Sequence, residues 1–215
     1  MDEVVIAEMR IRQFNEEVAD HATFCGGGSV AAVTAAGAAS LVLLVLGLAE
    51  KRKANTKHKS DIRSAIQKTE AARARFHELA DGDATALDAL LRAQAELRGA
   101  DDRSSYQSAL LSAALAPMET AEECLNLLRI IDEQMRRATR FTVSDLGAAG
   151  TLAFGALQAA TMMADINLAL LKKEPDTTLG EIESQLNRST ELVEHGRQHA
   201  SAIDSYTRTA IRGKE

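Results

Sequence analysis

Two long stretches almost free of formal charge constrain this chain more than any other feature. Val30 to Ala49 runs for 20 residues without Asp, Glu, Lys or Arg, and Leu146 to Leu171 has only Asp165. All other helical segments carry many charged residues, so these two are expected to be buried on all sides. A transmembrane span is not expected, because eleven of the 20 residues in the first stretch are Ala, Gly, Ser or Thr, which favour close helix packing over lipid insertion.

Apolar residues recur at three- and four-residue intervals along almost the whole chain, a pattern typical of helices. Only two prolines and 3% aromatic residues argue against an all-β fold. We expect one all-α domain over residues 1–215, a helical bundle in which two buried Ala/Gly-rich central helices are wrapped by long amphipathic helices. The predicted helices span roughly residues 2–20, 29–52, 55–98, 102–138, 144–173 and 177–212.

Two residues are expected to disturb these helices. Gly82 should interrupt the third, and Pro117 should kink or break the fourth. Because proline has no N–H group, a carbonyl near Ala113 should lose its helical partner.

The charge and the cysteine content limit the partners. A formal charge of −6 and a pI near 5.5 argue against nucleic-acid binding, which depends on Lys and Arg. Two cysteines and the absence of a charged-then-apolar leader predict a cytoplasmic protein. Two wholly buried helices in 215 residues predict a partner subunit, so we expect a homodimer that binds a small molecule and associates with no membrane.

The glycines before the first charge-free stretch form the first candidate ligand site. Gly26, Gly27 and Gly28 would let backbone approach a ligand closely, and Ser29 is a good N-cap. A flexible hinge with an ordinary cap is the alternative. With no preceding strand and no following Lys-Ser or Lys-Thr, a nucleotide phosphate loop is excluded.

A basic cluster follows the same stretch. Lys51 lies close enough to the buried helix to reach back toward a cleft and bind an anionic substrate, although cations that cap a helix C-terminus would look the same. Asp83, beside Gly82, could be partly desolvated and suited to acid–base chemistry. Asp145, near the start of the second buried helix, is also explained as a helix N-terminal charge. Asp165 and Asn167 need hydrogen-bond partners if they are buried, from the core or from a ligand.

The remaining reactive residues give weaker signals. His195 and His199 have the i, i+4 spacing of metal ligands, but no third ligand is evident and no metal is expected. Cys25 precedes a helix N-terminus, which would lower the pKa of its thiol, but no base is evident beside it.

The order of these features resembles the cyclodeaminase/cyclohydrolase family, which comprises the C-terminal domain of formiminotransferase-cyclodeaminase and stand-alone methenyltetrahydrofolate cyclohydrolases. The similarity spans about residues 8–205. It rests on Gly26-Gly27-Gly28-Ser29-Val30-Ala31-Ala32, the Ala-rich helix, Lys51, Asp83, Pro117, Ser144-Asp145 and Ile166-Asn167. The chain departs from the family pattern at Thr23 to Cys25, Leu48 to Glu50, Ala138 to Thr142 and Met163.

The resemblance implies a homodimeric enzyme that makes or breaks a ring C–N bond at a formimino or methenyl unit of tetrahydrofolate, which is its substrate, with no bound prosthetic group. It implies Asp83 and Asp145 as acid–base residues and Lys51 as the partner of substrate carboxylates. Ser144 and Asn167 would bind the ring system, and residues 26–29 would line the ligand. Two alternatives remain open, a relative that acts on a non-folate amine or imine and a non-catalytic helical binding protein.

Overall fold

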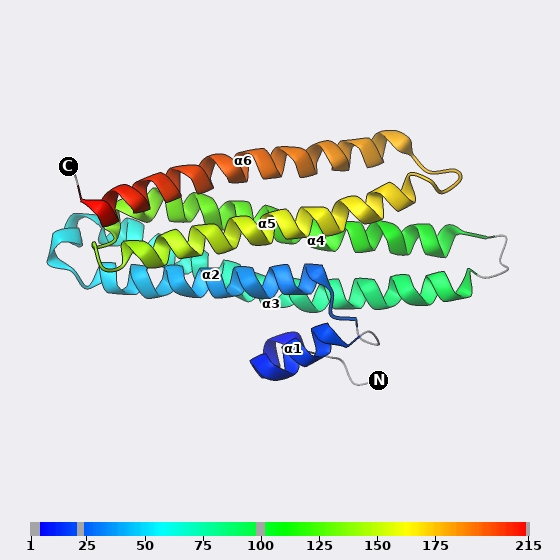
Figure 1. The fold of residues 1–215 in the computed structure, drawn as a ribbon, viewed down its shortest axis with the longest axis horizontal. Helices are drawn as coiled ribbons and strands as arrows, with labels where there is room; N and C mark the ends of the chain where they lie inside the picture. The colour runs from blue at the N-terminus through cyan, green and yellow to red at the C-terminus, as the bar shows by residue number, and fades with distance from the viewer. Residues whose placement is uncertain (1–4, 21–23, 98–101, 214–215) are drawn as a thin grey trace.

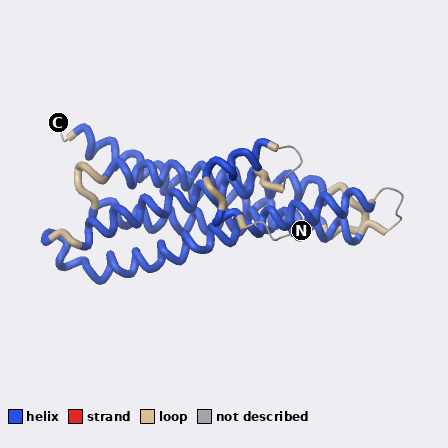
Figure 2. Tube along the Cα trace, turned by 90° about the horizontal axis from the view of Figure 1, so that it is seen from below, coloured by secondary structure: helices blue, strands red, loops and turns tan. Residues whose placement is uncertain are grey.

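The computed structural model describes residues 5–20, 24–97 and 102–213. Within these ranges the chain is helical and has no strand, which confirms the all-α prediction (Figures 1 and 2). The α-helices are α1 (Ile11–Ala19), α2 (Gly27–Glu50), α3 (Lys59–Glu96), α4 (Ser104–Gln134), α5 (Val143–Leu171) and α6 (Leu179–Arg212). The short 3-10 helices are η1 (Ile6–Glu8), η2 (Lys53–His58) and η3 (Met135–Arg137).

Two features of the predicted helices differ from the structure. The first predicted helix is divided into η1 and α1, because Met9 and Arg10 have extended backbone angles. The predicted break at Gly82 is wrong, since α3 continues through it. A glycine inside a helix costs only about 1 kcal/mol relative to alanine, and the buried residues Ala80 and Ala84 hold this part of α3 against the core. Residues 2–4 and 98 of the predicted helices lie outside the described ranges.

Helices α2 to α6 form an elongated bundle in which consecutive helices run in opposite directions (Figure 1). Helix α5 packs against α2, α4 and α6, and α2 also packs along α3. The largest side chains of the core, such as Phe76, Leu46 and Leu128, are completely buried between these helices. The start of α2 lies partway along the bundle, beside Asp83 of α3 and Met163 of α5, and the end of α2 lies near the start of α5 (Figure 1).

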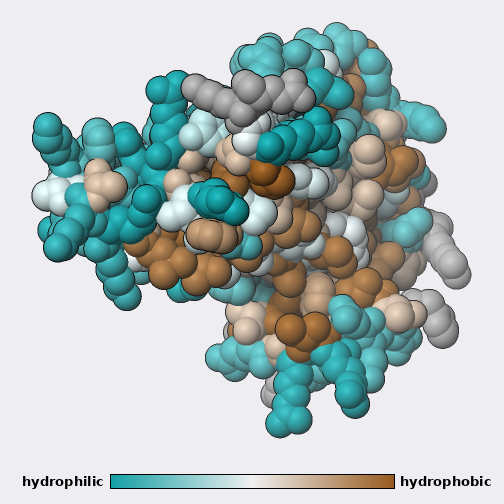
Figure 3. All heavy atoms as spheres, turned by 60° about the vertical axis from the view of Figure 1, so that its left-hand side comes forward, coloured by the Kyte–Doolittle hydropathy of each residue, from teal (hydrophilic) through white to brown (hydrophobic). Residues whose placement is uncertain are grey.

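Within one chain, helices α2 and α5 are buried on one side only, so their burial on all sides stays a prediction that depends on a partner subunit. In the most apolar 18-residue stretch of each helix, 50% is buried in α2 and 39% is buried in α5. By length and composition alone both helices could cross a membrane, but core helices of soluble proteins meet the same criteria. Their exposed sides form one surface, here called the apolar face, and Figure 3 shows hydrophobic side chains gathered in a band between hydrophilic ones. Its larger members are Leu44, Leu48, Leu152, Met162 and Ile166.

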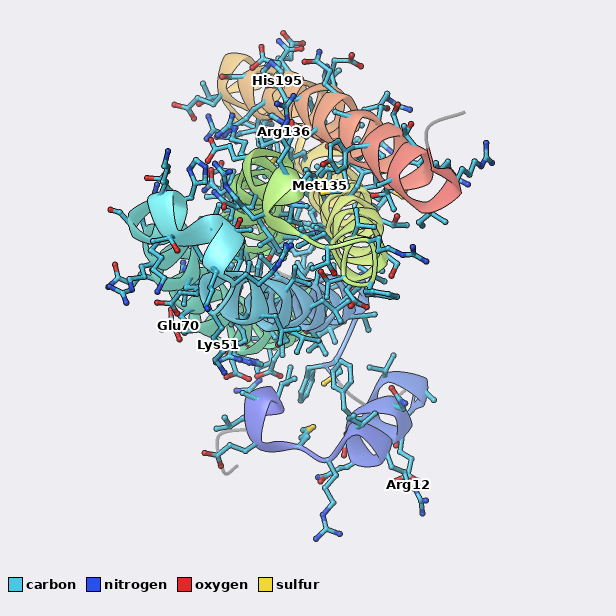
Figure 4. All side chains as sticks on the ribbon, turned by 90° about the vertical axis from the view of Figure 1, so that its left-hand side faces the viewer. Arg12, Lys51, Glu70, Met135, Arg136 and His195 are labelled. Atoms are coloured by element: carbon cyan, nitrogen blue, oxygen red, sulfur yellow. The ribbon has the colours of Figure 1, made fainter. Side chains whose placement is uncertain are left out.

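The N-terminal arm, η1 with α1, lies apart from the bundle (Figures 1 and 4). It is anchored where the N–H of Ile6 donates to Asp81 Oδ1 of α3 over 2.6 Å. Ile6 and Phe14 are buried, whereas Ile11 is 82% exposed. The arm is therefore held by a few contacts close to the beginning of α2.

Candidate active site

The glycine segment begins α2, but not with the expected cap. Helix α2 starts at Gly27 with Gly26 as its N-cap, so Ser29 lies inside the first turn and is fully buried. The prediction of Ser29 as the N-cap is therefore wrong. The hydrogen-bond acceptor for this turn comes instead from α3, where Asp83 Oδ2 lies 2.9 Å from Ser29 Oγ.

Asp83 is a buried carboxylate beside the start of α2, with 9% of its surface exposed. Burial raises its pKa, and hydrogen bonds from the side chain and backbone of Ser29 oppose part of that rise. The net effect is a pKa above the usual value, so the carboxyl group holds its proton at a higher pH than an exposed aspartate. A carboxyl group that holds its proton more tightly than usual is a candidate for acid–base chemistry.

Two glycines of α2 lie directly against side chains of neighbouring helices. A Cβ atom at Gly28 would lie 2.0 Å from Asp83 Oδ1, so only glycine fits beside this carboxylate. A Cβ atom at Gly27 would lie 2.8 Å from the Met163 sulfur of α5. The first turn of α2 is thus enclosed by α3 on one side and α5 on another, while Gly27 itself remains exposed.

Cys25 lies among acidic groups, so the pKa of its thiol is raised, whereas the helix N-terminus was expected to lower it. Burial and the charges of Glu17, Asp83 and Asp81 raise its pKa, so the helix N-terminus does not produce a reactive thiolate here. The sequence could not show that three carboxylates from α1 and α3 surround this residue. Of the divergent segment Thr23 to Cys25, Thr23 lies outside the described residues.

Asn167 uses its amide nitrogen within the protein. Nδ2 donates to the carbonyl of Ala113 over 2.8 Å and to the carbonyl of Met163 over 3.1 Å. Pro117 and Ala113 belong to α4, which continues through Pro117. Ala113 is the residue whose carbonyl was expected to lose its helical hydrogen-bond donor. If Asn167 meets a ligand, it does so as an acceptor through Oδ1. Asp165, another polar residue of α5, has a buried Oδ1 without a hydrogen-bond partner among the described residues.

The other predicted residues lie far from Asp83, at the end of the bundle where α2 ends and α5 begins. Lys51 is the exposed C-cap of α2. The 24 residues of α2 place it about 36 Å from Gly27 at 1.5 Å per residue. Ser144 and Asp145 lie in the first turn of α5, near the same end. Figure 4 looks onto this end and shows Lys51 at its periphery. One chain therefore does not bring Lys51, Ser144 or Asp145 to Asp83.

Other features of the described residues add no second candidate centre. His199 Nδ1 lies 2.8 Å from Asp132 Oδ2, and no group of three or more His, Cys, Asp and Glu there could hold a metal ion. A cavity of about 780 Å³ lies between α4 and α6, where Glu119, Glu122 and Arg188 are among its lining residues. It includes none of the predicted site residues.

Comparisons with known proteins agree with this architecture. Residues 10–187 match the family model described as formiminotransferase-cyclodeaminase. A methenyltetrahydrofolate cyclohydrolase of Methylorubrum extorquens is 24% identical over 162 residues, which cover 73% of this chain and 78% of that protein. A crystal structure of formiminotetrahydrofolate cyclodeaminase from Thermotoga maritima superposes with a TM-score of 0.79 at 21% identity, and the match covers 97% of this chain and 98% of that one.

Proposed function

Since the chain belongs to the formiminotransferase-cyclodeaminase family, we propose that it makes or breaks a ring C–N bond at the formimino or methenyl carbon of a tetrahydrofolate derivative. The observation that carries this proposal is the buried Asp83 carboxyl, held against Gly28 and Ser29 with a raised pKa. No specific feature of the structure favours a non-folate substrate or a scaffolding role. The cytoplasmic location, the single domain and the absence of a prosthetic group stay predictions.

The reaction needs a proton donor and a base at one carbon. In cyclodeamination the ring-closing nitrogen forms a bond to the formimino carbon and loses its proton, while the bond from that carbon to the departing nitrogen breaks and this nitrogen is protonated to leave as ammonia. In hydrolysis a water molecule adds to the methenyl carbon and loses a proton, and one ring C–N bond then breaks, which leaves a formyl group on the other nitrogen. A carboxyl group whose pKa is raised by burial can exchange a proton in either direction, and this is the role we assign to Asp83.

We further propose that the protein is a homodimer joined through the apolar face. Its two helices offer large exposed side chains, while Gly37, Gly47 and Gly155 have open space that permits a close approach. Two adjacent helices of this length, each about 10 Å wide, present about 700 Å², close to the roughly 800 Å² per partner of a stable protein interface. A second copy has the same charge-free surface, so it is the occupant that fits.

Charge favours an antiparallel arrangement of the two copies of α2. Glu17 and Asp81 lie near the start of α2, whereas Lys51 and Lys53 at its other end are exposed. No ion pair involves these two lysines among the described residues. A two-fold axis across the middle of α2 would place the basic end of one copy over the acidic end of the other, whereas a parallel pair would juxtapose like charges. Lys51 of the second copy would then complete the site at Asp83 by binding substrate carboxylates, and Ser144 and Asp145 would accompany it.

Replacement of Leu44 and Leu48 by glutamate is expected to convert the dimer to a monomer at micromolar concentration. Two charges would be buried in an apolar interface without partners, which opposes association. Light scattering gives the mass directly. Leu179→Glu is the matched control, because Leu179 is 51% exposed, close to the 52% of Leu44, but begins α6. A wild-type protein that is already monomeric would contradict the proposed dimer.

The proposed reaction is tested by absorbance of the methenyl compound. Purified protein is supplied with 5-formiminotetrahydrofolate in one assay and with 5,10-methenyltetrahydrofolate in the other. Formation or consumption of the methenyl compound above the uncatalysed rate is expected. Absence of both activities, together with no binding of tetrahydrofolate, would overturn the proposal.

A further inference from the structure

Pro117 creates a local defect in the middle of α4. Its ring nitrogen carries no hydrogen, so the carbonyl of Ala113, one turn earlier, has no helical donor. Both residues are buried, and a buried carbonyl without a partner is costly. This position therefore requires a donor from another part of the chain.

The donor is the amide nitrogen of Asn167 on α5. It lies 2.8 Å from the carbonyl oxygen of Ala113 and 3.1 Å from that of Met163. Both partners are acceptors, so this nitrogen must face them and both of its hydrogens are used. The bond to Ala113 joins α4 to α5, and the bond to Met163 fixes the Asn167 side chain on its own helix.

The same contacts lead to the proposed active site. Met163 lies one turn before Asn167, and its sulfur packs over Gly27 at the start of α2. The next two residues of α2, Gly28 and Ser29, hold the Asp83 carboxylate. A shift of α5 relative to α4 would therefore move the side chain that closes the first turn of α2.

We propose that Pro117 and Asn167 form one unit, in which Asn167 supplies the hydrogen bond that Pro117 withholds and so positions Met163 and the first turn of α2. Asn167 is then a positioning residue that acts through α5. The family resemblance implied a different role, in which Asn167 binds the ligand. The proposal concerns packing first, and its effect on catalysis rests on the proposed function.

The packing part is tested with Asn167→Ala, Pro117→Ala and the double variant, by chemical denaturation. Asn167→Ala alone leaves the Ala113 carbonyl unpaired and is expected to lower the folding equilibrium constant about 5- to 100-fold. Alanine at position 117 restores an N–H to the helix, so in that background the same change should cost less than about 3-fold. An equal cost in both backgrounds would overturn the proposal.

The control is Gln107→Ala. Gln107 also lies on α4 and donates to a carbonyl, that of Pro175 over 2.7 Å, at a site away from Pro117. Its loss should cost the same in both backgrounds. If Asn167→Ala alone does not fold, recovery of folded protein in the double variant supports the proposal, and failure to recover while Pro117→Ala folds contradicts it.

The catalytic part is read from kinetics in the methenyl assay. Asn167→Ala is expected to lower turnover about 10-fold or more with little change in the Michaelis constant, and Pro117→Ala should restore most of that loss. A residue that binds substrate would instead raise the Michaelis constant, and a change at position 117 would not restore it. If the protein has no activity on folates, the denaturation cycle still decides the packing part.

Discussion

Asp83→Asn is expected to lower turnover in the methenyl assay by about 10² to 10⁴-fold while the protein remains folded. The amide keeps the size of the side chain, and its oxygen can still accept the hydrogen bonds of Ser29, but it cannot exchange a proton at neutral pH. The control is Asp88→Asn, on the same helix, where the carboxylate pairs with Arg92. Near-normal turnover in Asp83→Asn would make Asp83 a structural cap of α2 and would leave the chemistry to Asp145 or another group.

The same variant has a definite effect on the pH dependence of stability. A carboxyl whose pKa is raised in the folded state destabilises that state when it is ionised, so the penalty grows as pH rises through the folded pKa. The penalty is absent in Asp83→Asn. Its free energy of unfolding should therefore match or exceed that of the wild type at neutral pH, and the difference should shrink as pH falls. Denaturation at several pH values measures it.

Mixed dimers of Lys51→Ala and Asp83→Asn chains are expected to recover about half of the wild-type kcat/KM. Lys51→Ala alone should raise the Michaelis constant more than it lowers turnover, and reduce kcat/KM about 10- to 100-fold. If Lys51 of one copy serves Asp83 of the other, a mixed dimer has one intact site and one doubly damaged site. Two different affinity tags allow the mixed species to be isolated and assayed.

The crossed combination provides the control for this experiment. A wild-type chain paired with a Lys51→Ala/Asp83→Asn chain would contain two damaged sites if the residues act across the interface. It would contain one intact site if both residues act within one chain. Recovery in the crossed combination and none in the first would contradict the antiparallel dimer, even if the reaction on folates is confirmed.

The sequence predicted the fold well because helical periodicity and charge-free stretches are local signals. It predicted that Pro117 would strand a carbonyl near Ala113, but not that Asn167, far along the chain, would bind it. It likewise assigned the cap of α2 to Ser29, since local rules cannot foresee an acceptor from α3. Lys51 was expected to reach the site because it follows the buried stretch so closely in the sequence. The length of α2, which can also be read from the sequence, separates Lys51 from the glycines at the start of the helix.

The close approach of Gly28 to Asp83 limits how this chain can change. A methyl group at position 28 would meet the carboxylate at 2.0 Å from Oδ1. If Asp83 is replaced before Gly28, the first turn of α2 loses the carboxylate that caps it. If Gly28 is replaced before Asp83, the new methyl group displaces the carboxylate. Substitution at either position thus passes through an impaired protein. We expect positions 28 and 83 to vary jointly in functional relatives, as one coupled pair.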